Sequence, residues 1–252
     1  MAAQEIVGDE LPARTLSLKT GGVCLLIGTL GFTTARLLHG DTPAADADAA
    51  LTFVAGRPTY AAVHVVAVLA ASSIAIGIMA LASTLTRPSA WLLGRAATTT
   101  AVIGAAIFGV ESTSEGLALP ELASAAETDP GHRAEAVSAA RAVAAATHGP
   151  SLVAIALFIG ATLLLIGLSI RLEGYPGWLG IVGAIIGTVT LTAAVGLYLR
   201  PSLFPGALLY GVLASVVAQL WLAAVAVVML WRAVSGPDRL PGGPSTGVER
   251  TW

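Results

Sequence analysis

Residues 61–83 read AAVHVVAVLAASSIAIGIMALAS, a run without Asp, Glu, Lys or Arg. About 20 predominantly apolar residues in a helix cross the hydrocarbon core of a bilayer, so this stretch predicts a transmembrane helix. Five further runs of similar character follow or precede it. The sequence therefore predicts an all-α integral membrane protein, a six-helix bundle, rather than a soluble domain.

The composition of the whole chain agrees with this prediction. Of the 252 residues 56% are hydrophobic and 11% are charged, and the mean hydropathy is +0.82. A soluble domain carries about 25% charged residues. The net charge of −2 gives no sign of a nucleic-acid partner, and Cys24 as the single cysteine excludes an internal disulfide and a Cys-ligated iron–sulfur cluster.

The runs divide the chain into three parts. We predict a cytoplasmic N-terminal segment at 1–20, a transmembrane domain at 21–231 and a disordered cytoplasmic tail at 232–252. The six spans are predicted at about 21–38, 61–83, 91–111, 150–170, 177–199 and 207–231. The polar stretch 112–149 is predicted as an outer loop that carries one amphipathic helix, ended by Gly149 and Pro150.

The distribution of basic residues gives an orientation. Six spans place both termini on one side, and that side receives eight of the 13 Lys and Arg residues. These are Arg14, Lys19, Arg87, Arg95, Arg171, Arg232, Arg239 and Arg250. By the positive-inside rule the termini are cytoplasmic and the loop 112–149 faces outward.

The polar residues of chemical interest gather at the outer side of this topology. His64 lies one turn inside the second span, Glu111 ends the third span and His148 begins the fourth. His64 and Glu111 continue helix faces of small and polar residues, which suit a bundle interior because ionisable groups avoid lipid. Further candidates for the same pocket are Arg36, His39, Glu115, Tyr198 and Arg200.

Three uses fit this set of residues. Imidazoles with a carboxylate bind zinc, copper or non-haem iron, with His64, His148 and Glu111 as ligands. His64 and His148 alternatively ligate a b-type haem from two helices. Glu111 also suits a metal-free role as general acid or base toward a lipid-like substrate. Against all three, a histidine or glutamate at a helix end is often simply solvated, and Arg36 often extends toward the headgroups.

These uses lead to different functional classes. The leading hypothesis is a membrane-embedded metal- or haem-binding protein, an oxidoreductase or a lipid-acting enzyme with a site in the outer leaflet. The alternatives are a small proton-coupled transporter or channel subunit, a metal-free enzyme using Glu111, and a non-catalytic membrane scaffold. The expected partners are membrane lipids and a hydrophobic small molecule, and an oligomer is compatible with the sequence.

Short motifs also support a resemblance. The acidic first outer loop, Arg87-Pro88 after the second span, His148-Gly149 and the turn Gly174-Tyr175-Pro176-x-Trp178-Leu179-Gly180 are its elements. With these the chain resembles small bacterial multi-spanning inner-membrane proteins grouped as a domain of unknown function. The resemblance implies a six- or seven-helix membrane protein and implies no activity.

Overall fold

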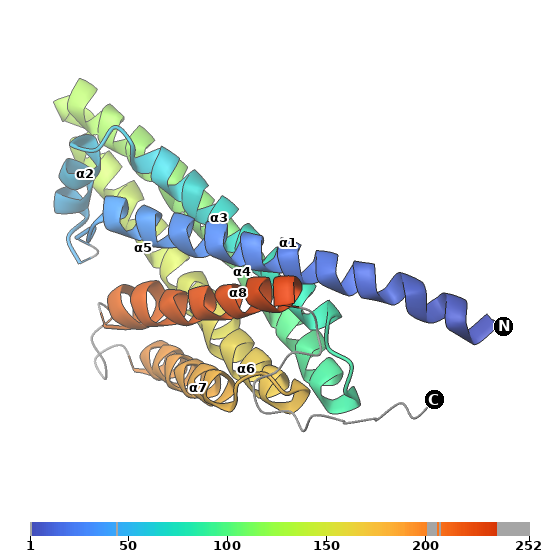
Figure 1. Cartoon of the computed structure of the whole chain (residues 1–252). Coiled ribbons are helices and arrows are strands. Elements are labelled where there is room, and N and C mark those ends of the chain that lie inside the picture. The colour runs from blue at the N-terminus through green and yellow to red at the C-terminus, as the bar shows by residue number, and fades with distance from the viewer. Residues whose placement is uncertain (1, 44, 201–205, 207, 236–252) are drawn as a thin grey trace, which may run out of the picture.

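The protein is built of helices throughout the part of the chain that the computed structural model describes, residues 2–43, 45–200, 206 and 208–235 (Figure 1). Most of the tail predicted at 232–252 lies outside these residues. The long elements are α1 (Ala2–His39), α3 (Tyr60–Ser83), α4 (Pro88–Thr128), α5 (Arg133–Ile155), α6 (Thr162–Glu173), α7 (Gly177–Leu199) and α8 (Ala218–Ser235). The short ones are α2 (Ala47–Ala55), η1 (Pro130–His132), η2 (Ala156–Ala161) and η3 (Leu208–Val217).

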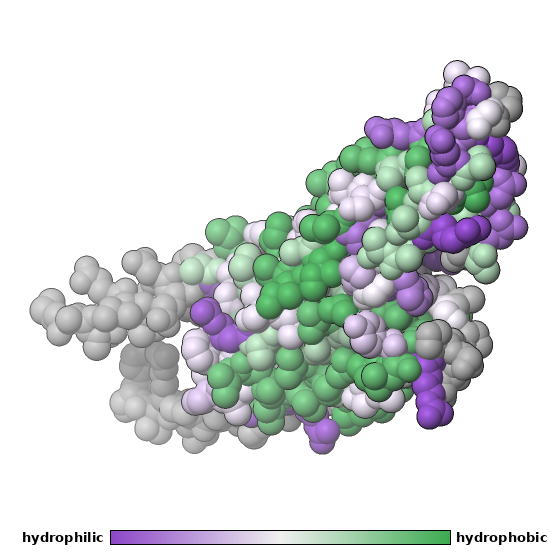
Figure 2. All heavy atoms as spheres, turned by 180° about the vertical axis from the view of Figure 1, so that it is seen from behind, coloured by the Kyte–Doolittle hydropathy of each residue, from purple (hydrophilic) through white to green (hydrophobic). Residues whose placement is uncertain are grey.

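Six helices of this bundle are long and apolar enough to cross a membrane, which confirms the predicted fold class. Several of their large side chains are exposed and apolar, among them Leu30, Leu69, Leu92, Ile185 and Leu220. Figure 2 shows hydrophobic residues over the body of the molecule, with hydrophilic residues gathered at its projecting end. An apolar exterior on the body and a polar end are what a bilayer requires of a multi-pass protein.

The segment 112–149 differs from the expected loop. The helix α4 continues from Pro88 through Pro120 to Thr128, and α5 passes through Pro150 without ending there. At 41 residues α4 is about 60 Å long, twice the roughly 30 Å of the hydrocarbon core. Alanine, leucine and glutamate are strong helix formers, so the helix continues through this stretch. The polar composition of the stretch indicates that this part of the helix lies outside the membrane.

The projecting hairpin of α4 and α5 has a small hydrophobic core of its own. Leu51 and Val54 of α2 pack against Leu119 and Ala123 of α4 and against Ala140 of α5. An ion pair of 2.8 Å between Arg133 and Asp48 joins α5 to α2 at the edge of this core. The loop between α1 and α3 is thereby fixed against the hairpin, which closes one side of the site described below.

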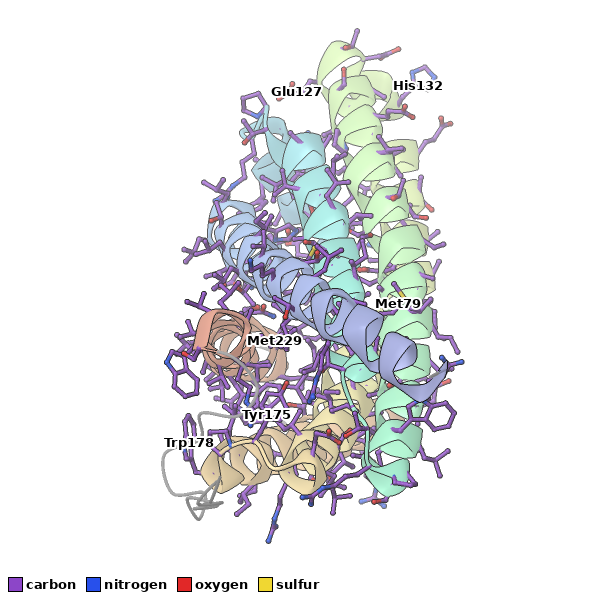
Figure 3. The ribbon with its side chains drawn as sticks, turned by 45° about the vertical axis from the view of Figure 1, so that its right-hand side comes forward. Met79, Glu127, His132, Tyr175, Trp178 and Met229 are labelled. Atoms are coloured by element: carbon purple, nitrogen blue, oxygen red, sulfur yellow. The ribbon has the colours of Figure 1, made fainter. Side chains whose placement is uncertain are left out.

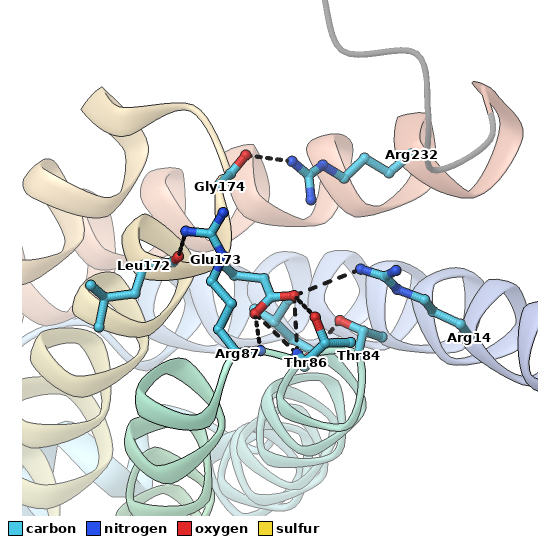
Figure 4. A network of polar contacts seen from close by, with 9 residues as sticks. Arg14, Thr84, Thr86, Arg87, Leu172, Glu173, Gly174 and Arg232 are labelled. Atoms are coloured by element: carbon cyan, nitrogen blue, oxygen red, sulfur yellow. Dashed lines mark hydrogen bonds and ion pairs between the residues drawn. The ribbon is translucent and has the colours of Figure 1, made fainter. Parts of the chain in front are cut away.

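At the opposite end of the bundle, one buried carboxylate connects several elements (Figure 4). Glu173 at the end of α6 accepts hydrogen bonds from the backbone N–H groups of Thr86 and Arg87 at 3.0 Å, just before α4 begins. Arg14 of α1 lies 3.9 Å from the same carboxylate. Arg232 of α8 donates to the carbonyl of Gly174 at 2.9 Å. One end of the molecule therefore contains the first part of α1, the turn between α3 and α4, the turn between α6 and α7, and the end of α8.

The labelled residues of Figure 3 show the two ends. Glu127 and His132 lie at the tip of the hairpin, whereas Tyr175 and Trp178 lie at the opposite end, where α7 begins. Trp91 and Trp231 are exposed near that same end, like Trp178. Exposed indole rings are typical of a membrane–water interface, so their positions mark one boundary of the membrane-embedded body.

Candidate functional site

A cavity of about 670 Å³ lies at the end of the bundle where α1 ends and α3 begins. Its walls come from α1, α3, α4, α5, η2 and η3 and from the loop after α1. The charged, histidine and tyrosine residues of the wall are Arg36, His39, Asp41, His64, Glu111, Glu115, Arg141, His148 and Tyr210. The cavity therefore contains most of the candidates predicted from the sequence, together with Asp41, Arg141 and Tyr210.

His64 is held in one orientation by its own helix. Its Nδ1 lies 2.9 Å from the carbonyl oxygen of Tyr60, one turn earlier in α3, and the side chain is buried. A carbonyl only accepts, so Nδ1 must carry the proton. In the neutral imidazole the lone pair is then on Nε2. The second ring nitrogen of His64 is thus available as an acceptor or ligand.

His39 is fixed in a similar way at the end of α1. Its Nδ1 lies 2.9 Å from the carbonyl of Gly40, a glycine in the left-handed conformation (φ +69°) that ends the helix. Arg57 donates to the carbonyls of Leu38 and His39 at 2.9 and 3.0 Å, which satisfies the last carbonyls of α1. His39 too is left with a free Nε2.

Glu115 completes a cluster with the two histidines. One ligand atom from each of His39, His64 and Glu115 lies within 4.8 Å of the others. The hydroxyl of Tyr60 donates to Oε1 of Glu115 at 2.9 Å. Thr42 Oγ1 lies 3.3 Å from the Tyr60 hydroxyl and must therefore donate to it. Glu115 is oriented by Tyr60 and keeps its second carboxylate oxygen for another partner.

Close packing of α3 on α4 brings these residues together. A Cβ on Gly116 would lie 2.6 Å from both Cβ and Cγ of His64, much closer than such atoms approach in proteins. Only glycine at this position lets α4 approach the ring of His64. Glu115, the neighbour of Gly116, is placed beside His64 as a result.

Glu111 lies one turn before Glu115 on α4 and is 9% exposed. Residues four apart share a helix face, so both carboxylates are directed to the same side of α4. Arg36 does not pair with either of them, because its guanidinium binds Asp41 and donates to the carbonyl of Gly40 at 2.6 Å. Glu111 is thus a buried carboxylate beside the half-buried Glu115 of the cluster.

The remaining predicted residues are placed as follows. His148 lines the cavity but is exposed, and it is outside the cluster of His39, His64 and Glu115. Tyr198 and Arg200 are exposed at the end of α7 and are not among the described residues that line the cavity. The fourth histidine, His132, lies at the tip of the hairpin with Asp129 at 2.7 Å.

Several residues of the site are not among those predicted from the sequence. Tyr60 precedes His64 by four residues, and Arg141 precedes His148 by seven, spacings that put each pair on one helix face. In the sequence, these spacings are the pattern that indicates Tyr60 and Arg141 as residues of the site. No sequence pattern predicts the π-helical segments η2 and η3, although Phe158 and Ile159 of η2 and Tyr210 and Ser215 of η3 line the cavity. Such segments occur often at functional sites.

Comparison with known proteins identifies the family. Residues 20–226 match the family described as a domain of unknown function, DUF4386, and the chain belongs to this family. The match confirms the resemblance drawn from the short motifs of the sequence. No curated protein and no solved structure matches the chain.

Proposed function

We propose that the protein is a membrane-embedded metalloenzyme in which His39, His64 and Glu115 hold one transition-metal ion. The observation that carries this proposal is the set of hydrogen bonds that orient the three candidate ligands. Both imidazoles have Nδ1 hydrogen-bonded to a backbone carbonyl, and the carboxylate accepts from Tyr60. Histidines that ligate metals almost always donate their other N–H in this way.

The types of ligand limit the choice of ion. Two imidazoles and one carboxylate suit zinc, and they suit non-haem Fe(II) equally. Three protein ligands leave a coordination position open, as in catalytic sites. The haem alternative has less support, because the ring of His64 packs 4.6 Å from Tyr60 and 4.9 Å from His39, centroid to centroid. A porphyrin at Nε2 would have to displace both rings.

Hydrolysis is the reaction class that these residues serve best. A bound divalent ion supplies a water of lowered pKa and polarises a substrate oxygen. Glu111 is buried, lines the cavity and lies one turn from Glu115. With an ester as substrate, the carboxylate of Glu111 would accept the proton of the attacking water. It would return that proton to the leaving oxygen when the ester bond breaks.

The distribution of basic residues supports an outer-side location for this chemistry. The site lies at the end of the bundle away from Arg14, Arg87 and Arg232, which gather around Glu173 and Gly174. Basic residues are concentrated in cytoplasmic segments. We therefore assign the Glu173 end and both termini to the cytoplasm of a bacterium and the cavity to the outer leaflet of its inner membrane.

Metal analysis of the purified protein tests the proposal. The wild-type protein is expected to retain about one zinc or iron per chain after dialysis, because three protein ligands hold one ion. His39→Ala, His64→Ala and Glu115→Gln should each lose it. Glu111→Gln should keep it, because Glu111 acts on water and not on the ion.

Two matched variants control for the substitutions themselves. His132→Ala removes a histidine at the hairpin tip, and Glu121→Gln neutralises an exposed carboxylate of α4. Both should keep the metal content of the wild type. A folded wild-type protein that binds no zinc or iron after loading would overturn the proposal, as would equal losses in the control variants.

A proton-coupled transporter is the second candidate, favoured by one specific observation. Beside the cavity, two membrane-spanning helices change from α-helical to π-helical hydrogen bonding, at η2 between α5 and α6 and at η3 directly before α8. Transporter sites are typically formed by discontinuous helices. Proton-coupled uptake of solute into proteoliposomes, lost in Glu111→Gln but unaffected by removal of metal, would favour this candidate over the enzyme.

A further inference from the structure

We infer that the cavity binds an amphiphile with a phosphate headgroup and one hydrocarbon chain, with Arg141 as the headgroup's cation. The inference names the substrate class of the proposed enzyme and rests on that proposal for the chemistry, although not for the binding. It follows from the charges at the mouth of the cavity and from the division of its walls into a polar half and an apolar half.

The charges leave Arg141 as the available cation. Arg36 is neutralised by Asp41 and directs a second donor to Gly40. Arg141 lines the cavity, is exposed and has no ion pair among the described residues. A guanidinium binds phosphate through two parallel N–H donors, which an ammonium or imidazole does not offer in one plane.

The proposed metal ion changes the balance of the remaining charges. Glu111 and Glu115 bring at most two negative charges to the cavity wall, which a divalent ion cancels. With Arg36 and Asp41 cancelling each other, Arg141 leaves the loaded site with at least one positive charge. A phosphate monoester or diester is therefore attracted by the loaded cavity, with Arg141 as its cation.

The apolar half lies deeper in the membrane on three helices. Phe32 precedes His39 on α1, and Phe108 precedes Glu115 on α4. Ile155 follows His148 on α5, a helix that runs in the opposite direction. Each pair is seven residues apart, which is about 10 Å along a helix.

This common offset separates the cavity into two layers. A polar layer at the outer end contains His39, Glu115 and His148, and an apolar layer lies about 10 Å further into the membrane. Phe158 and Ile159 of η2 extend the apolar layer. A molecule that fills both layers needs a charged head and a hydrocarbon chain, which inorganic phosphate lacks.

The volume agrees with such a ligand. At about 670 Å³ the cavity lies within the range of roughly 300–1,000 Å³ for pockets that bury drug-sized ligands. One acyl chain with a glycerol phosphate head is of this size class. We therefore choose lysophosphatidic acid as the probe, monoacylglycerol of the same chain length as the probe without charge, and inorganic phosphate as the probe without a chain.

Equilibrium binding of these three probes to the full-length protein in neutral nanodiscs tests the inference. Lysophosphatidic acid should bind one per chain, and both other probes should bind at least about tenfold more weakly. Monoacylglycerol lacks the hydrogen bonds to a charged group, and inorganic phosphate has no chain to bury against the apolar layer. Arg141→Ala should reduce lysophosphatidic acid binding by at least about tenfold, and Arg141→Lys should recover part of it. Arg95→Ala, at the opposite end of the molecule over Trp91, should have no effect.

The outcomes separate this inference from the proposed function. Unchanged lysophosphatidic acid binding in Arg141→Ala, or equal binding of monoacylglycerol, would overturn the inference even if the protein holds its metal. Tight binding of inorganic phosphate alone would overturn the requirement for a chain. Arg141-dependent lipid binding in a wild-type protein that binds no metal would support the inference and overturn the metalloenzyme.

Discussion

Tyr60 is the residue that orients two of the three proposed ligands. Its carbonyl accepts from Nδ1 of His64, and its hydroxyl donates to Glu115. It is 2% exposed and packs against Leu51 and Leu119 in the core of the hairpin. The packing of α2 and α4 around Tyr60 thus fixes the positions of His64 and Glu115.

Replacement of Tyr60 by phenylalanine tests this role. The variant keeps the ring and the backbone carbonyl and removes only the donor to Glu115. Loss of such an outer contact costs about 10- to 100-fold in metal affinity, measured by competition with a chelating dye. Tyr198→Phe, at an exposed position of α7, is the control and should leave the affinity unchanged. Equal affinities of Tyr60→Phe and the wild type would show that Tyr60 does not position the carboxylate.

Which residues form the site was only partly visible from the sequence. The topology brings His39, His64, Glu111, Glu115 and His148 to the same end of the bundle, and all five line the cavity. The subset close enough to share an ion depends on helix rotation and on the close approach at Gly116. A pattern within one helix does not contain the distance to its neighbour, so that choice required the structure.

At the scale of elements, glycines set how closely the helices pack. Gly183 and Gly187 of α7 form a GxxxG pair, a pattern that favours close helix packing, and the structure has close packing at both positions. A Cβ at Gly187 would lie 2.2 Å from the backbone nitrogen of Leu164, and one at Gly183 would lie 2.3 Å from the ring of Trp221. The helices α6 and α8 thus touch the backbone of α7 on its two glycine positions.

Alanine at Gly187 should therefore separate α6 from α7. Because the obstructing atoms belong to the backbone, we expect a loss of about 1–3 kcal/mol of stability, the usual cost of overpacking, seen as a lower midpoint of thermal unfolding. Gly196→Ala on the same helix is the matched control, since a Cβ there meets nothing within 4 Å. If the two variants have the same midpoint, close packing at Gly187 does not stabilise the protein.

The elements also show where the sequence was insufficient. The apolar runs predicted the helical fold class, because a bilayer permits few other structures. For the polar stretch 112–149 the sequence predicts an outer loop with one amphipathic helix, whereas α4 runs without a break to Thr128 and α5 runs from Arg133 through Pro150. Hydropathy indicates where the membrane ends and does not indicate where a helix ends.

At the scale of the whole molecule, the site lies at the opposite end from the contacts of Glu173 and Gly174. The Glu173 contacts gather α1, α4, α6 and α8 at one end, and the hairpin of α4 and α5 projects at the other (Figures 1 and 4). The proposed orientation places the hairpin outside the cell. In that orientation, the proposed amphiphile would reach the cavity from the outer leaflet.

Labelling of single cysteines in intact cells tests this arrangement. In a Cys24→Ser background, Asp129→Cys at the hairpin tip should react with a membrane-impermeant maleimide added outside. Ser89→Cys, exposed at the start of α4, should react only after the cells are permeabilised. Labelling of both positions from the same side would contradict the topology, and the reverse pattern would invert the orientation.

The most direct test of the metal site is X-ray absorption spectroscopy of the metal-loaded protein. The account predicts two imidazole nitrogens at about 2.0–2.1 Å from a zinc ion, together with carboxylate and water oxygens. In His39→Ala, any metal that remains bound should show one imidazole. A first shell of oxygen atoms alone in the wild-type protein would contradict the claim that His39, His64 and Glu115 form a metal centre.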